Sequence, residues 1–408
     1  MELPRYIPRS LEPVLVQASS EFPAVVLTGP RQSGKTTLLR HLFAERFGYA
    51  SMDLPDVRHA AASDPRGFLA MHPSPMILDE VQNVPELLPY IKEEIDAHRS
   101  RPRQFLLSGS QNLLLLEQVS ETLAGRVAVL RLLPLSSREA RGQRDAPLPW
   151  EDGWDDRIPG GPSHLALWNE LLRGGYPELW STPERDLRLW HASYVQTYLE
   201  RDVRSLRQVG DLSLFQSFLR ALAARSAQLL NMSDLSRNLG LAVNTARAWL
   251  SVLEATHQII VLRPYSANIG KRMVKTPKVY FTDVGTLCHL AGLGDAQSAA
   301  AGPMAGAIME TAVVAEVYKR LAHRGDLPTL HFWRTSTGVE VDLLVEAGQR
   351  LVPLEVKVSA TPRPAMATGI RSLMADLGSK VTPGYIVHPG EVRLPMGDGI
   401  VALPFSDL

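Results

Sequence analysis

The segment Gly29-Pro-Arg-Gln-Ser-Gly34-Lys35-Thr36 constrains the fold more than any other part of this 408-residue chain. It fits the pattern G-x-x-x-x-G-K-T, in which the backbone N–H groups of a glycine-rich loop wrap a phosphate. The apolar run PAVVLT precedes it, and the helix-like run TTLLRHLF follows it. A strand, a loop and a helix in this order predict a nucleotide-binding parallel sheet. A glycine-rich turn that binds no ligand is the alternative.

The expected roles within this phosphate loop follow from the chemistry of ATP and Mg²⁺. Lys35 is expected to reach the β- and γ-phosphates, and the Thr36 hydroxyl to bind Mg²⁺. We therefore expect ATP and Mg²⁺ as cofactors. The residues expected to hold the nucleotide are Gly29, Pro30, Arg31, Gln32, Ser33, Gly34, Lys35, Thr36 and Thr37.

Two further strand-like runs end in polar residues. MILDE ends in Asp79, which is expected to hold Mg²⁺, and Glu80, which is expected to orient and deprotonate the attacking water. In QFLLSGSQN, Ser110 and Gln111 are candidates for sensing the γ-phosphate. A helix N-cap formed by Ser110 is the alternative.

Arg126, in ETLAGRV, is expected at the end of a helix, just before the next strand. In a ring-forming ATPase this position faces the nucleotide of the neighbouring subunit, where an arginine stabilises the transferring phosphate. Arg126 is therefore a candidate catalytic residue acting between subunits. A surface cation at a helix C-terminus is the alternative.

The chain is too long for one ordinary core, and its pattern changes along its length. Residues 24–135 alternate strand-like and helix-like runs, which predicts a parallel sheet with helices on both faces. Residues 141–163 are rich in Gly, Pro and Asp and are expected to form a surface loop. Apolar stripes predict helices over 164–255. Strand-like runs return from about residue 277, around a long helix near 304–323.

Composition and hydropathy limit the possible partners and location of the protein. Lys+Arg and Asp+Glu both number 43, so net charge does not predict nucleic-acid binding. No apolar run approaches the roughly 20 residues of a membrane span, so no membrane partner is expected. The single cysteine, Cys288, suits a reducing compartment, and we expect a cytoplasmic protein.

Residues 231–254 have the layout of a helix-turn-helix, with a turn at Gly240 and a second helix from about Val243. The second helix is expected to present Asn244, Thr245 and Arg247 to solvent and to bury Trp249, Leu250 and Leu253. A wing is expected to follow. Its basic residues are candidates for phosphate contacts, with packing against protein as the alternative: Lys271, Arg272, Lys275 and Lys278.

Charged residues in the last third of the chain predict a second site. Asp342 lies in the strand-like run VEVDLLVE, and Glu355 and Lys357 are two residues apart in LEVKV, so they share one face of a strand. Asp342 and Glu355 are expected to share a divalent ion, with Lys357 beside the nucleophile or the phosphate. A structural pair of Glu355 and Lys357 is the alternative.

In combination, the strings GPRQSGKTTLL, ILDEVQNVPELLPYIKEEID, LLSGSQN, ETLAGRV with LPLSSRE, GGYPE and YLERDV make this chain resemble the AAA+ superfamily. The resemblance is to prokaryotic ATPases whose C-terminal half was long described as a domain of unknown function. It implies an α/β fold with a P-loop parallel sheet and a lid in which Arg173 contacts the nucleotide. The D…ExK arrangement is similar to PD-(D/E)xK nucleases, with Glu310 in their auxiliary acidic, metal-binding position. The implied divisions are an AAA+ ATPase core at 1–140, a helical lid at 164–205, a winged-helix domain at 206–280 and an α/β nuclease-like domain at 281–408.

Together these patterns predict an ATP-dependent motor that assembles as a homo-oligomeric ring. It is expected to process duplex or branched DNA, such as Holliday junctions, in repair or recombination. Mg²⁺-dependent endonuclease cleavage is a separate expectation, because nuclease-like domains also bind DNA without cutting it. The rival interpretation is an ATP-gated signalling or defence switch whose nuclease-like domain is a non-catalytic scaffold.

Overall fold

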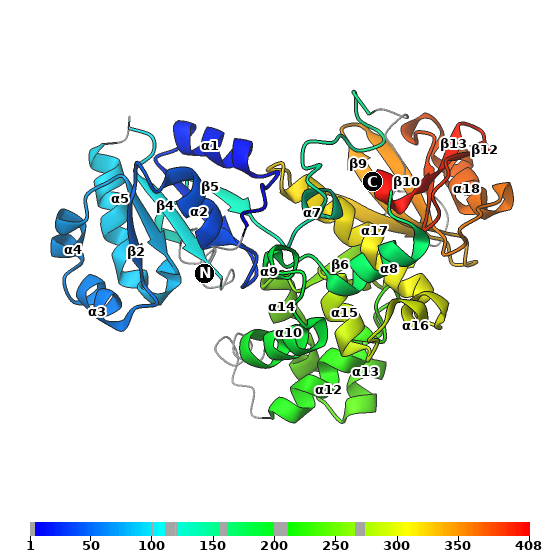
Figure 1. Cartoon of the computed structure of the whole chain (residues 1–408), viewed down its shortest axis with the longest axis horizontal. Coiled ribbons are helices and arrows are strands. Elements are labelled where there is room, and N and C mark those ends of the chain that lie inside the picture. Colours follow the sequence, from blue (N-terminus) through cyan, green and yellow to red (C-terminus); the bar gives the residue numbers. More distant parts are fainter. Residues whose placement is uncertain are drawn as a thin grey trace.

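The computed structural model describes residues 5–98, 101–110, 119, 121–154, 161–199, 211–265 and 274–408. Figure 1 shows a smaller α/β unit at one side, coloured blue to cyan, and a larger unit formed by the rest of the chain. Within the described residues, the strands form one five-stranded sheet and one eight-stranded sheet. No helix in these ranges is both long enough and apolar enough to cross a membrane.

The first sheet is entirely parallel and has the order β2-β3-β4-β1-β5. The strand-like runs expected in this region are confirmed as strands. The short β2 was not predicted, because GYAS offers no apolar run and two of its four residues are exposed. The strands are β1 (Ala24–Thr28), β2 (Gly48–Ser51), β3 (Met76–Asp79), β4 (Phe105–Gly109) and β5 (Val127–Arg131).

Helices cover both faces of this sheet, as expected, because successive residues of a strand point to opposite faces. Val25 and Leu27 pack with α1 (Glu12–Glu21) and α2 (Lys35–Phe43). Ala24 and Val26 pack on the other side, with helices that follow β2 and β3. These are α3 (Pro55–Ser63), α4 (Pro65–Met71) and α5 (Leu88–Ala97).

The segment from 164 to 255 is helical where it is described, as expected. Gly240, at φ 66°, ends α13 and turns the chain into α14. On α14, Trp249 and Leu253 are buried and Asn244 and Arg247 are exposed, whereas Thr245 and Leu250 are half-buried. The elements are α8 (His164–Arg173), α9 (Pro177–Ser181), α10 (Leu187–Tyr194), the π-helix η3 (Val195–Leu199), α12 (Leu212–Ala223), α13 (Met232–Leu239) and α14 (Val243–Ala255).

The second sheet is mixed and has the order β12-β13-β11-β10-β9-β8-β6-β7. Its end strands, β6 and β7, come from the predicted wing, so the sheet continues across residue 280. The strands are β6 (Ile259–Pro264), β7 (Lys278–Phe281), β8 (Leu330–Arg334), β9 (Glu340–Ala347), β10 (Arg350–Val356), β11 (Tyr385–His388), β12 (Leu394–Gly397) and β13 (Ile400–Pro404).

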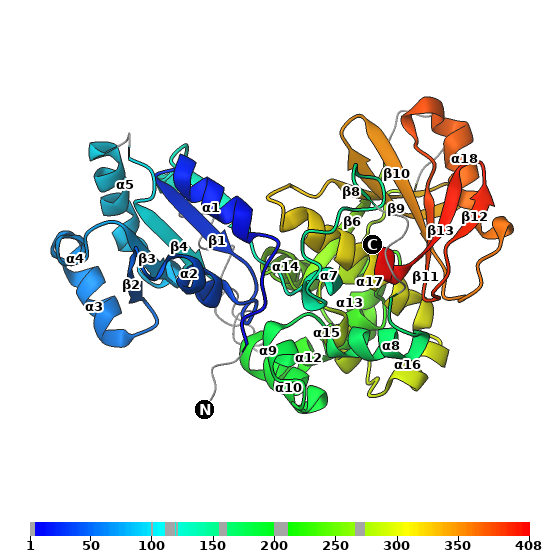
Figure 2. The same cartoon turned by 45° about the horizontal axis from the view of Figure 1, so that its top comes forward.

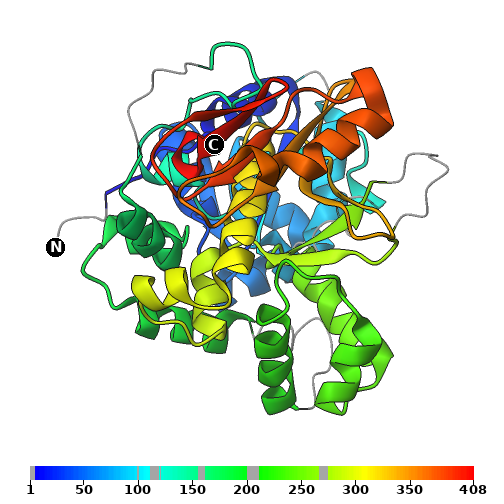
Figure 3. The same cartoon turned by 90° about the vertical axis from the view of Figure 1, so that its right-hand side faces the viewer.

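Two helices pack on opposite faces of the second sheet. The predicted long helix is α17 (Ala305–Ala322), which shares a core with Leu354 of β10. Helix α18 (Thr368–Leu377) shares another core with Leu351. Figure 3 shows α17, in yellow, beneath the orange and red C-terminal strands. Figures 1 and 2 both place the C-terminal end of α17 beside α7 (Ser137–Ala140), where the chain leaves the first unit.

Candidate nucleotide site and acidic cluster

The phosphate loop joins the C-terminal end of β1 to the N-terminus of α2. Two glycines make the turn possible. A Cβ on Gly29 would lie 2.0 Å from the carbonyl oxygen of Leu132, and Gly34 has a φ of 94°, which disfavours other residues. The predicted loop is therefore confirmed as a tight turn that leads into a helix N-terminus, where backbone N–H groups attract anions.

Lys35 is almost fully buried, and its ammonium lies against the loop to which it belongs. Its Nζ donates to the carbonyl oxygens of Gly29 and Pro30, both at 2.9 Å. The ammonium is therefore placed within the turn that would surround a phosphate. This geometry agrees with the role predicted for Lys35.

Asp79 collects hydroxyl groups from three elements. Its Oδ2 accepts from Thr36 Oγ1 at 2.8 Å and from the Tyr49 hydroxyl at 3.0 Å, and its Oδ1 accepts from Ser108. Strand β4 lies between β1 and β3, which brings Ser108 to this carboxylate. Thr36 and Asp79, the two predicted Mg²⁺ ligands of this site, are thus in direct contact. A carboxylate, a hydroxyl and substrate phosphates suit Mg²⁺, so these residues fit the ion.

Glu80 follows Asp79 with a left-handed φ of 54°, which turns its side chain toward the end of β4. It accepts from Ser110 Oγ at 2.9 Å and from Gln82 Nε2 at 2.5 Å. Burial raises the pKa of Glu80, but Lys35 and these hydrogen bonds more than offset it, and the pKa lies below its usual value. The carboxylate is therefore ionised at neutral pH, as a base that activates water requires.

A cavity of about 500 Å³ lies beside the phosphate loop. Its walls come from the loop, from the N-terminal segment and from α9, in the region predicted as a lid. Glu80 and Gln32 face this cavity, as do three arginines that were not predicted to lie here: Arg5, Arg9 and Arg185. The lining residues that carry charge or contact the loop are Arg5, Arg9, Arg31, Lys35, Thr36, Thr37, Glu80, Glu178 and Arg185.

Arg173, the predicted lid contact, does not line this cavity. Its guanidinium donates to the carbonyl oxygens of Leu179 and Pro183 and lies over the ring of Trp180. Arg185 from the same region lines the cavity instead and pairs with Glu178 at 2.9 Å. The pattern around Arg173 could not show this, because the closure of a lid depends on tertiary packing.

Ser110 and Arg126 occupy different surroundings. Ser110 is buried and donates to Glu80, and its contact with the γ-phosphate stays a prediction. Gln111 lies outside the described residues.

Arg126 lies away from the cavity of its own chain and pairs with Asp96, with Nε–Oδ1 at 2.8 Å. Its action on a neighbouring subunit stays a prediction.

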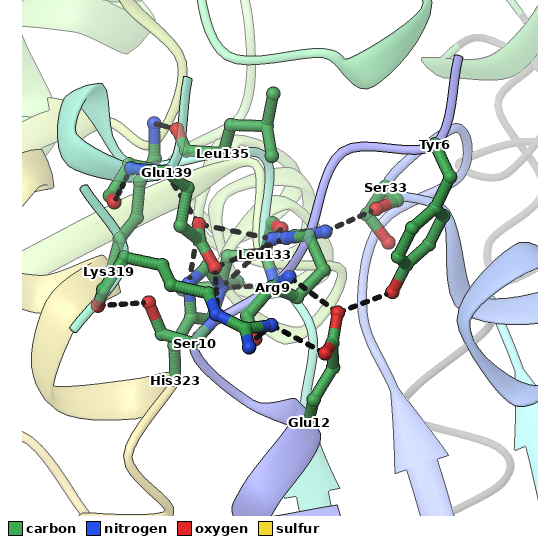
Figure 4. Close-up of polar contacts among 12 residues, drawn as sticks. Tyr6, Arg9, Ser10, Glu12, Ser33, Leu133, Leu135, Glu139, Lys319 and His323 are labelled. Atoms are coloured by element: carbon green, nitrogen blue, oxygen red, sulfur yellow. Dashed lines mark hydrogen bonds and ion pairs between the residues drawn. The ribbon is translucent and has the colours of Figure 1, made fainter. Parts of the chain in front are cut away.

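A buried polar network ties the phosphate loop to the C-terminal half of the chain (Figure 4). Arg9 donates to the Ser33 carbonyl at 2.9 Å, to the Leu133 carbonyl at 2.7 Å and to Glu139 at 3.1 Å. Glu139 also lies 3.0 Å from Nδ1 of His323, which follows the last turn of α17. Sequence reasoning missed this network, because its members are up to 314 positions apart.

The second predicted site is brought together by the fold. Glu310, Glu340, Asp342 and Glu355 form an acidic cluster between α17, β9 and β10. Lys357 Nζ lies 2.6 Å from Glu355 Oε1, as the predicted pair requires. Burial, with neighbouring Asp342, raises the pKa of Glu310 to about 7 and that of Glu355 to about 8. Burial likewise raises the pKa of Asp342.

Lys278 is buried, so the prediction that it contacts phosphate as part of the wing is wrong. Its side chain is 3% exposed and cannot meet a phosphate at the surface. Its Nζ lies 2.7 Å from Glu310 and 2.5 Å from Glu340, inside the acidic cluster. Lys275 is exposed, whereas Lys271 and Arg272 lie outside the described residues.

The predicted metal ligands Glu310, Asp342 and Glu355 lie in this cluster, and metal binding by them stays a prediction. In the described part of the chain, no three His, Cys, Asp or Glu side chains are grouped to hold an ion. The physical reason at this cluster is the ammonium of Lys278, which already bridges two of its carboxylates. An ion held by both Glu310 and Glu340 would have to displace this ammonium.

Comparisons with known proteins support an ATPase domain around the phosphate loop. Residues 21–141 match the family described as an AAA domain. Residues 165–297 and 305–408 match two domains of unknown function, DUF8612 and DUF4143. The uncharacterized proteins Rv2008c of Mycobacterium tuberculosis and Mb2031c of Mycobacterium bovis are each 33% identical over 396 residues, which is 97% of this chain and 82% of theirs.

Two solved structures are similar to part of this chain. The Walker-type ATPase PABY2304 of Pyrococcus abyssi has a TM-score of 0.46 at 17% identity and covers 70% of this chain and 96% of its own. The Holliday junction branch migration motor RuvB of Thermotoga maritima has a TM-score of 0.26 at 18% identity, with coverages of 62% and 85%.

Proposed function

Because this chain belongs to the same family as Rv2008c and Mb2031c and is a P-loop ATPase with an AAA domain, we propose that its ATP hydrolysis drives the processing of DNA. In this proposal Mg²⁺ is held by Thr36 and Asp79, Lys35 binds the phosphates and Glu80 activates water. The DNA is duplex or branched, as at Holliday junctions. The working form is a homo-oligomeric ring in which Arg126 reaches the next subunit's nucleotide.

One observation carries the DNA part of this proposal. Among the described residues from 231 to 281, four exposed charged residues are cations, whereas Glu254 is half-buried and the one exposed carboxylate, that of Asp234, lies 3.5 Å from Arg225. DNA phosphates attract a surface of this kind whatever the base sequence, because binding releases condensed counterions. The exposed cations lie on α13, α14, β6 and the segment before β7: Arg237, Arg247, Arg263 and Lys275.

We propose that α13 and α14, followed by the antiparallel pair β6 and β7, act as a winged helix. The pair follows α14 directly, as a wing does, and α14 exposes Asn244 and Arg247. Few exposed polar groups on α14 can read base edges. Contacts to phosphates therefore explain its surface better than sequence-specific readout does.

The experiment is a salt series of DNA affinity, measured by fluorescence anisotropy on a labelled duplex and a four-way junction. Replacing Arg237 and Arg247 by alanine should weaken binding to both and reduce the slope of log affinity against log salt by about 2. The control is Arg58→Ala, an exposed arginine on the distant α3. If R237A/R247A and R58A bind alike, the winged-helix assignment fails.

A second candidate function has its own support in α17. Its C-terminal end joins the Arg9 network at the phosphate loop, and Glu310 near its beginning lies in the acidic cluster. One helix therefore connects both sites, as an ATP-gated switch requires. In such a switch the nuclease-like unit is a scaffold, hydrolysis is slow and DNA does not change its rate.

A further inference from the structure

The acidic cluster has the composition of a cation site. Glu310 comes from α17, Glu340 and Asp342 share a face of β9, and Glu355 lies on the neighbouring β10. Glu355 is 8% exposed, and its Oε2 has no hydrogen-bond partner in the described residues. Carboxylates gathered at such low exposure are costly unless a cation lies among them.

Lys278 supplies that cation from β7. Its Nζ lies 2.7 Å from Glu310 Oε1, 2.5 Å from Glu340 Oε1 and 3.9 Å from Asp342 Oδ1. The ammonium donates to Glu310, forms a close ion pair with Glu340 and attracts Asp342 at longer range. The Tyr280 hydroxyl, two residues along the same strand, donates to the same oxygen of Glu310 at 2.6 Å.

This position conflicts with a divalent ion. Mg²⁺ binds oxygens at about 2.0–2.1 Å. The Lys278 ammonium contacts the oxygens of Glu310 and Glu340 that an ion between them would need, and two cations at that spacing repel each other strongly in a buried setting.

The charge balance agrees with this reading. The four carboxylates face Lys278, Lys357 and Arg334, the last of which lies 2.8 Å from Glu340. Lys278 is the one of these three cations that lies against both Glu310 and Glu340, so its removal leaves these two carboxylates short of positive charge.

We infer that Lys278 is the resident cation of the acidic cluster and that it excludes divalent metal from a site that the carboxylates would otherwise form. This inference rests on the nuclease-like reading of the second sheet within the proposed function. It is independent of whether the chain acts on DNA. It assigns Lys278 the place that a metal ion would take, and Lys357 a supporting role at the rim.

The test measures Mn²⁺ binding by nucleotide-free protein, using the electron paramagnetic resonance signal of free Mn²⁺. Wild type and Glu310→Gln should bind equally, because the cluster contributes no site while Lys278 is present. Lys278→Ala should gain one Mn²⁺ site. Adding Glu310→Gln to Lys278→Ala should lower that affinity by roughly tenfold or more, because a ligand is lost.

Two further variants separate position from charge. Lys357→Met removes one positive charge from the same cluster but leaves Lys278 between the carboxylates, so it should gain no site. Lys278→Met replaces the ammonium by an apolar group of similar length and should bind Mn²⁺ through Glu310 if Lys278→Ala does not fold. Folding is checked by circular dichroism and thermal unfolding.

The inference is overturned if wild type binds Mn²⁺ more tightly than Glu310→Gln does. It is equally overturned if folded Lys278 variants gain no Glu310-dependent site. If neither Lys278 variant folds, the comparison of wild type with Glu310→Gln decides. None of these results depends on DNA-stimulated ATP turnover, so failure of the proposed function and failure of this inference are distinguishable.

Discussion

The Arg9 guanidinium donates to the carbonyl oxygen of Ser33 in the phosphate loop, with Nη1 and the oxygen 2.9 Å apart. The same guanidinium pairs with Glu139, at the N-terminus of α7, where Ser136 and Glu139 form a capping box. His323 contacts Glu139 from the end of α17, so these buried contacts connect the phosphate loop to the second unit.

Arg9→Met should strongly destabilise the protein, because it leaves the carboxylate of Glu139 buried without the guanidinium that balances its charge. Both side chains are nearly inaccessible, at 3% and 0% exposed. Breaking such a pair costs about 3–5 kcal/mol. The matched control is Arg66→Met, which breaks the exposed pair with Glu93 and should cost less than about 1 kcal/mol. Equal losses in urea unfolding would show that Arg9 is not a connecting residue.

Stability should fall as pH falls below 6.5, in part because of His323. Burial lowers the pKa of His323 from its usual 6.5, and its Nε2 accepts from the Leu133 N–H at 3.1 Å, so the neutral ring is the folded form. Below 6.5 the unfolded chain binds the proton and the folded chain does not, which favours unfolding. Neighbouring Arg9, together with His323, also holds the pKa of Glu139 well below its usual value despite burial. The contribution of Glu139 is therefore lost at still lower pH.

The measurement for this pH effect is urea unfolding of wild type and His323→Gln at a series of pH values from 7.5 downward. The variant should lose stability less steeply just below 6.5, since glutamine does not titrate. Other groups that titrate cancel in this difference between the two proteins. Parallel curves would contradict the assignment of His323.

Glu80→Gln should keep ATP affinity and lower turnover by about 10²–10⁴-fold, because the amide cannot accept a proton from water. Ser110→Ala should give a smaller loss of turnover, because it removes the hydroxyl that holds Glu80 at 2.9 Å. Nucleotide affinity is measured with a fluorescent ATP analogue and turnover by phosphate release. A Glu80→Gln variant that hydrolyses ATP at the wild-type rate would sink the assignment.

Arg126→Ala should bind ATP normally and lose about 10³-fold or more in turnover if the side chain acts on the next subunit's nucleotide. The control is Asp96→Asn, which removes the partner of Arg126 within the chain and leaves the arginine in place. A structural pair alone predicts similar small effects for both changes. A large loss of turnover with Arg126→Ala but not with Asp96→Asn would identify the subunit contact.

The fold of the first unit could be predicted from the sequence because its strands are apolar runs separated by helical patterns. The phosphate loop and Asp79 could be placed because they follow those strands directly. The buried position of Lys278 could not be predicted, because it depends on contacts with Glu310, Glu340 and Asp342, which are 32 or more positions away in the sequence. A cation in a basic run indicates a solvated surface unless tertiary contacts show otherwise. Arg9 was missed for the same reason.

The most direct test of the central claim is steady-state ATP turnover with and without DNA, measured for duplex, single-stranded and four-way junction DNA at one salt concentration. If the chain is a DNA-processing motor, turnover rises with duplex or junction DNA, and the rise is lost in R237A/R247A but retained in R58A. Turnover that stays slow and unchanged by every form of DNA would contradict the motor and leave the ATP-gated switch.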